Sequence, residues 1–194
     1  MTAPFNSSAV SSLAEVIAAQ SGGLTFVPQA HLRLWLPDLT VPPGWAAGSI
    51  NDPAVTRVLV RRLGSGHHWD GCEVLNVYRV PGTVPETIVL NNADRTLRDS
   101  GANDIRTYRL DVPPCYGVIA MRSSGTLHAD ARTIHSHFHH YVINTAAGGA
   151  LIEQVVAVGA EALPRLNREV EDLIEILYRS LLTSIERAPK SPTF

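Results

Sequence analysis

Four segments with strand character follow one another between residues 105 and 158, and this run constrains the fold more than any other feature of the sequence. The segments are Ile105 to Val112, Tyr116 to Arg122, Arg132 to Asn144 and Ala150 to Val158. The turn signals between them are Pro113-Pro114, Ser123-Ser124-Gly125 and Ala147-Gly148-Gly149. Such short connections join antiparallel neighbours, because a parallel crossover needs a dozen or more residues. The run therefore predicts a hairpin-connected, largely antiparallel sheet.

Helical periodicity replaces this pattern after the last strand. Apolar residues recur at steps of three and four from Leu163 to Ile185, which predicts a long helix with one face buried on the sheet. A chain of 194 residues is long enough for one well-cored domain. We therefore expect a single domain over residues 1–187, followed by a flexible tail at 188–194.

Two shorter helices are expected. The first carries an apolar stripe that ends near Ile17, with Ser7 or Ser8 as its cap. The second runs from Thr83 to about residue 100, because Thr83 and Glu86 have the spacing of a capping box and a proline lies in the first turn.

Earlier strands complete the layout. In His31 to Leu36 every second residue is leucine, which predicts a strand with Leu32, Leu34 and Leu36 on one face. The other expected strands are Leu24 to Val27, Thr56 to Leu63 and Cys72 to Val80. No glycine-rich phosphate turn follows any strand, so Rossmann and P-loop folds are excluded. The fold class is predicted to be α+β.

Charge and hydropathy narrow the classes of partner. The net charge is −2 and the isoelectric point is about 6.4, which gives nucleic acids and anionic membranes no electrostatic attraction. No segment approaches the roughly 20 apolar residues that a membrane span needs, and no leader is recognisable, so a cytoplasmic location is expected unless a specialised system exports the chain. Lys190 is the only lysine among 16 basic residues, a bias typical of high-GC actinobacterial genomes.

The most conspicuous motif is a histidine-rich strand. His135, His137 and His139 share one face of it, and imidazole is a ligand of zinc, copper and nickel. Three ligands along one strand span roughly 13 Å, so they cannot all reach one ion. The sequence therefore predicts no metal set and no cofactor. A polar or ligand-lined strand face is expected, with a metal-dependent enzyme as an open alternative.

Other catalytic arrangements find little support. Cys72 and Cys115 are expected to be small buried residues on strands, and a bridge between them would need an oxidising location. No Gly-x-Ser-x-Gly elbow is present. We therefore predict that the chain is not an enzyme and assign no catalytic residue.

The three tryptophans point to binding instead. Trp35, Trp45 and Trp69 fall at strand ends or in loops, where indoles either close a core edge or line a ligand mouth. Together with His135, His137 and His139 they form the predicted set of binding residues.

The order of these motifs resembles that of a known family. A segment from Leu36-Pro37 to Pro42-Pro43-Gly44-Trp45 is followed by a strand, by Leu75-Asn76-Val77-Tyr78, by Ile105-Arg106-Thr107-Tyr108, by a meander and by a long helix. This is similar to the mycobacterial LpqN/LpqT family of probable lipoproteins, whose fold resembles the PsbP-like α/β/α sandwich. The resemblance implies a curved antiparallel sheet covered by helices and no catalytic residues. The lipoprotein signal is missing, so we expect a soluble relative without an inherited envelope role.

The function expected from all this is a non-enzymatic module that binds another protein or a small ligand, such as an adaptor or a chaperone. The main alternative is a carrier that holds a hydrophobic ligand beneath the long helix.

Overall fold

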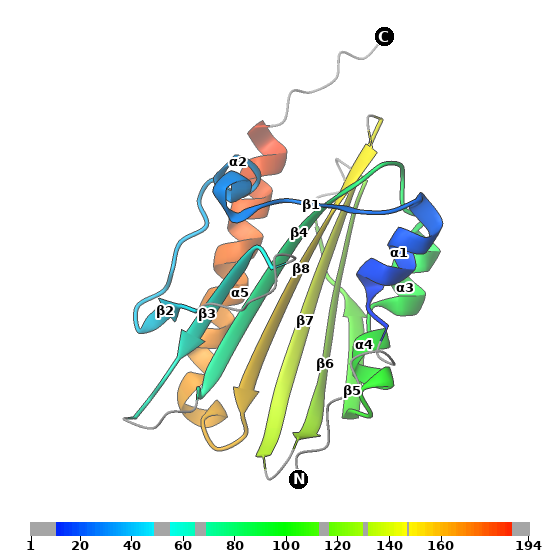
Figure 1. Ribbon diagram of the computed structural model, residues 1–194. Helices are drawn as coiled ribbons and strands as arrows, with labels where there is room; N and C mark the ends of the chain where they lie inside the picture. Colours follow the sequence, from blue (N-terminus) through cyan, green and yellow to red (C-terminus); the bar gives the residue numbers. More distant parts are fainter. Residues whose placement is uncertain are drawn as a thin grey trace.

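The computed structural model describes residues 11–48, 55–64, 69–112, 117–129, 132–146 and 148–187 (Figure 1). Its strands are β1 (Thr25–Phe26), β2 (Trp45–Ala47), β3 (Arg57–Arg61), β4 (Gly71–Val80), β5 (Asn103–Arg109), β6 (Val118–Ala129), β7 (Arg132–Thr145) and β8 (Gly148–Gly159). Its helices are α1 (Leu13–Ser21), a 3₁₀ turn η2 (Gln29–His31), α2 (Leu32–Trp35), α3 (Glu86–Asn92), α4 (Arg95–Asp99) and α5 (Leu163–Arg187).

All the strands join one antiparallel sheet. The order is β2-β3-β4-β8-β7-β6-β5, and β1 pairs with the end of β4 beside β3. The last strand along the chain, β8, therefore lies between β4 and β7. The α+β class and the largely antiparallel sheet are confirmed.

Helices cover both faces of the sheet. In Figure 1, α5 lies on one side, while α1, α3 and α4 lie on the other. Leu166, Leu173 and Leu177 of α5 are fully buried against the sheet. On the opposite face Leu13 and Ile17 of α1 pack with strand residues such as Val142 and Leu151 in a separate apolar cluster. The long buried helix expected from the periodicity is confirmed.

Helix α1 begins at a complete capping box. The Ser12 hydroxyl accepts a hydrogen bond from the Glu15 N–H at 3.2 Å, and the Glu15 carboxylate accepts one from the Ser12 N–H at 2.8 Å. The expected caps Ser7 and Ser8 lie outside the described residues. Gly22 ends the helix with a φ of 79°, a conformation that glycine adopts without strain.

The expected strand from His31 to Leu36 is wrong. The segment forms η2 and α2, Leu34 is 82% exposed, and Leu32 and Leu36 are buried. Residues four apart share one face of a helical turn as well as one face of a strand. The leucine spacing therefore fitted both structures.

The expected helix from Thr83 begins later and is divided. Helix α3 starts at Glu86, with Pro85 at its N-cap and no side-chain cap, so the predicted capping box does not form. A proline disfavours helical conformation in the residue before it, so Val84 cannot be the first helical residue that the predicted capping box requires. The second part is the short helix α4.

The expected turn at Ser123-Ser124-Gly125 is also wrong, because β6 continues through it to Ala129. The Ser123 hydroxyl is buried and donates to the Ala93 carbonyl at 3.0 Å. At Gly125 an added Cβ would lie 3.3 Å from the backbone oxygen of Asn103. These small residues permit close packing across the strand rather than a chain reversal. Pro113-Pro114 lies outside the described residues.

Candidate functional site

The three predicted histidines lie on the α5 face of β7 but have different surroundings. His139 is fully buried, whereas His135 and His137 are half-buried. Nδ1 of His137 lies 3.3 Å from the Arg122 guanidinium, and Nδ1 of His135 lies 3.2 Å from the Thr126 hydroxyl. Burial, together with the positive charge of Arg122, lowers the pKa of His137 to about 4. His137 is therefore a neutral hydrogen-bonding group near pH 7.

A row of polar residues crosses the sheet beneath α5. Arg57 Nη2 lies 2.8 Å from one Glu73 carboxylate oxygen and donates to the other at 2.9 Å. The Gln154 amide donates to Glu73 at 2.7 Å and to the Leu173 carbonyl of α5 at 3.3 Å. This row separates the two apolar clusters that α5 covers.

His139 and Arg122 continue the row toward the edge of the helix. His139 lies opposite Gln154 in the register, and Arg122 lies opposite His139. Neither ring nitrogen of His139 has a hydrogen-bond partner among the described residues. Burial and the charge of Arg122 hold the His139 pKa well below its usual range. The row reaches solvent at Arg122, whose guanidinium lies 3.3 Å from the Glu171 carboxylate of α5.

Sequence reasoning missed this row. The available signal was that Glu73 and Gln154 occupy apolar positions of their strands, in phase with Leu75 and Ile152. A polar residue in such a position normally has a buried partner. The partners, however, come from distant parts of the chain.

Beyond α5, part of the sheet is left open to solvent. We define this open face by Arg106, Tyr108, Arg122, His135 and His137. Tyr108 is 46% exposed, and the Arg122 guanidinium lies 5.9 Å from the centre of its ring. Tyrosine and arginine, like tryptophan, are enriched among the residues that contribute most of the binding energy at protein interfaces. The open face thus joins two of the predicted histidines to three residues outside the predicted binding set.

The predicted tryptophans lie in three separate places. Trp45 is a core residue, 6% exposed, and its indole N–H donates to Glu169 of α5 at 3.1 Å. The half-buried Trp69 has the Arg132 guanidinium 5.0 Å from its ring. The half-buried Trp35 has Arg79 in the same relation at 5.4 Å. The structure does not bring the indoles together with the histidines.

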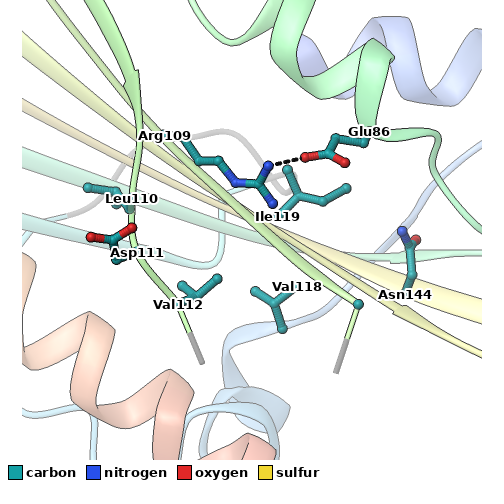
Figure 2. A pocket seen from close by; sticks show the side chains of 9 residues that line it. Glu86, Arg109, Leu110, Asp111, Val112, Val118, Ile119 and Asn144 are labelled. Atoms are coloured by element: carbon teal, nitrogen blue, oxygen red, sulfur yellow. Dashed lines mark hydrogen bonds and ion pairs between the residues drawn. The ribbon is translucent and has the colours of Figure 1, made fainter. Parts of the chain in front are cut away.

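Two grooves lie near one end of the sheet. The first, which we call the Arg109 groove, has a volume of about 520 Å³. Figure 2 shows Arg109 reaching across it to form an ion pair with Glu86, while Val112 and Val118 lie opposite each other in its apolar part. The guanidinium in this groove already has a carboxylate partner.

The second, which we call the Trp35 groove, has a volume of about 450 Å³. Its lining residues are Thr25, Trp35, Arg79, Val80, Pro81, Ile143, Thr145, Gly148, Gly149 and Ala150. None of them is acidic, and Arg79 forms no ion pair with any carboxylate among the described residues.

Among the described residues, side chains fill the space beneath α5. Leu166, Leu173, Leu177 and Leu181 are fully buried there, packed among strand side chains. The expected carrier site under the helix is therefore wrong, because the periodic leucines that predicted the helix also fill the space below it.

The described residues give no support to a metal site. Within them, no group of three His, Cys, Asp or Glu side chains could hold an ion. Cys72 has a free thiol whose pKa is raised by burial. Cys115, His67 and His68 lie outside the described residues. Across the same ranges, no helix is long and apolar enough to cross a membrane.

Comparison with known proteins supports the fold. No protein-family model matches the sequence, and no curated protein matches it. The structure is similar to that of LpqN of Mycobacterium tuberculosis, described as involved in cell envelope biogenesis, with a TM-score of 0.62 over 87% of this chain and 94% of LpqN. The two sequences are 14% identical, so the likeness concerns the fold alone. The chain thus has an LpqN-like α+β fold, as the motif order predicted.

Proposed function

We propose that this chain is a non-catalytic binding module and that another protein docks on the open face. The observation that carries the proposal is the juxtaposition of exposed Tyr108 with Arg122 and His137, where α5 leaves the sheet uncovered. LpqN, which has a similar fold, is described as involved in cell envelope biogenesis, and that description assigns no partner.

The chemistry of the open face fits a partner with mixed polar and apolar contacts. Arg106 is exposed and forms no ion pair with the described residues, whereas Glu171 stands beside Arg122 at the rim. His137 is neutral near pH 7 and can donate or accept a hydrogen bond without the cost of burying a charge. A partner that presents a carboxylate to Arg106 and an apolar side chain to Tyr108 would match both of these exposed residues.

The test is capture from the native host, followed by affinity measurement. We expect a protein that is enriched by the wild-type chain and lost with Tyr108→Ala and with Arg122→Ala. With the purified partner, each substitution should raise Kd about tenfold or more. Leu90→Ala is the matched control, because Leu90 is 39% exposed and belongs to α3, which lies on the opposite side of the sheet from α5 (Figure 1). A partner that is retained by both open-face variants contradicts the proposal.

A second candidate function is favoured by the Trp35 groove. Its volume of about 450 Å³ lies within the range of small-ligand sites. The expected hydrophobic carrier would then use this groove instead of the filled space beneath α5.

A further inference from the structure

We infer that the Trp35 groove binds a small amphiphile whose carboxylate head pairs with Arg79 and whose apolar chain lies along Trp35, Ile143 and Ala150. This inference rests on the second candidate function and names the class of ligand. It is independent of the open face, whose residues do not line the groove.

The unpaired charge of Arg79 is the first observation that favours a carboxylate. Seven arginines among the described residues form ion pairs with carboxylates, and Arg79 is not one of them. Its guanidinium instead lies 5.4 Å from the centre of the Trp35 ring. Stacking on an aromatic ring leaves the N–H groups at the edge of the guanidinium free to bind a carboxylate in bidentate fashion.

The composition of the groove walls is the second observation. Trp35, Pro81 and Ile143 supply apolar surface, while Val80 and Ala150 line the groove but are each only 3% exposed, and no lining residue is acidic. A cationic head would therefore meet Arg79 with no compensating carboxylate, and a purely apolar ligand would gain nothing from the exposed guanidinium, which stays hydrated. An acidic amphiphile can pair with the guanidinium through its carboxylate and contact the apolar walls with its chain.

The third observation is the difference between this groove and the Arg109 groove. That groove is similar in volume, but Arg109 is paired with Glu86, and Asp111 adds a second carboxylate to the lining. An entering anion would have to displace Glu86 and approach Asp111. The same ligand should therefore prefer the Trp35 groove, although both grooves contain an arginine.

The experiment compares three ligands with the same eight-carbon chain: octanoate, 1-octanol and octyltrimethylammonium. Binding is followed by the indole N–H signals in ¹H–¹⁵N spectra, assigned with single Trp→Phe variants. The Trp35 signal should shift and saturate, while the Trp45 signal should stay fixed, because that indole is buried and bonded to Glu169. Octanoate should bind about tenfold more tightly than octanol, and octyltrimethylammonium most weakly.

Variants then test the role of Arg79. Arg79→Met should raise the octanoate Kd to that of octanol, without a change in octanol affinity, and Arg79→Lys should keep part of the preference. Arg132→Met is the matched control, because it removes the other arginine stacked on a tryptophan and should leave octanoate binding unchanged.

Three results would overturn the inference. They are equal affinities of octanoate and octanol for the wild-type chain, a preference for octanoate that survives Arg79→Met, and no shift of the Trp35 signal with any of the three ligands. The last result would also remove the second candidate function, while the first two would remove only the choice of a carboxylate. Docking of a protein on the open face is decided separately by the Tyr108 and Arg122 variants.

Discussion

Two glutamates buried on opposite faces of the sheet, Glu73 and Glu153, have different surroundings. Under α5, the Glu73 carboxylate lies 2.8 Å from Arg57 and accepts a hydrogen bond from Gln154. Under α1, Glu153 and His140 lie opposite each other on β8 and β7. Within the described part of the chain, Glu153 forms no ion pair.

The difference shows what a partner does for a buried charge. Burial raises the pKa of Glu153 to about 7, although a hydrogen bond from the Ala14 backbone opposes the rise. Burial lowers the pKa of His140 to about 4. Without a close charged partner, each group of this pair favours its neutral form, because the interior solvates the charged form poorly. On the α5 face, the Arg57 guanidinium and the Gln154 amide donate to Glu73 the hydrogen bonds that water would otherwise have made.

The largest expected effect is on the α5 face. Glu73→Ala should lower the free energy of unfolding by about 3–5 kcal/mol, because it leaves the buried Arg57 guanidinium without its carboxylate. Urea unfolding at pH 7 measures the change. The double variant Arg57→Met/Glu73→Leu is the control and should recover most of the loss, since no unpaired charge remains. Equal losses in both variants would mean that packing, and not charge, decides stability at this row.

Glu153→Gln should change the pH dependence of stability. The folded-state pKa of about 7 exceeds the ordinary value of 4.5, so the stability from Glu153 is complete below pH 4.5 and is lost as pH rises through 7. Over this window the variant should gain about 3 kcal/mol relative to wild type. Urea unfolding at half-unit pH intervals from 4.5 to 8 measures the difference. Parallel curves for the two proteins would contradict the prediction.

His140→Gln should change the pH dependence of stability in the opposite direction. The folded-state pKa of about 4 lies below the ordinary value of 6.5, so the stability from His140 is complete above pH 6.5 and is lost as pH falls toward 4. The variant should therefore gain on wild type by about 3 kcal/mol as pH falls from 6.5 to 4. In wild type the contributions of Glu153 and His140 cancel between pH 4.5 and 6.5, so only the single variants uncover the two slopes in the same urea titration.

The smallest effect concerns the helix that covers Glu153. Ser12→Ala removes the hydroxyl that caps α1 and should cost about 1 kcal/mol. Thermal unfolding at pH 6 measures it. Ser184→Ala is a useful comparison on the other face, because the Ser184 hydroxyl donates to the Trp35 carbonyl at the C-terminal end of α2 and not to the start of a helix. A cost for Ser12→Ala near zero would show that packing alone holds α1.

Local periodicity predicted the parts of the fold that are long and regular. Strand β7 and helix α5 matched their expected ranges closely, because many residues repeat the same pattern. The segment from His31 to Leu36 was too short to separate a strand from a helical turn. The helix expected at Thr83 failed at Pro85, where a backbone restriction outweighed an apparent cap.

The candidate site was predicted only in part. The shared face of His135 and His137 follows from alternation along one strand. Tyr108 and Arg122 could not be found in this way, because β5 and β6 bring them beside the histidines through pairing. The difference between Arg79 and Arg109 likewise depends on whether a carboxylate from another element is near, which a linear pattern does not record.

The sequence by itself determined an antiparallel sheet with helices and a long α5 with one buried face, because strand alternation and helical spacing are local properties. Only the tertiary structure decided that β8 enters between β4 and β7, which places Gln154 next to both Glu73 and His139. It also decided which of the described arginines form ion pairs with carboxylates and which, like Arg79, do not. These outcomes depend on contacts between residues far apart in the chain, where burial and charge act through space.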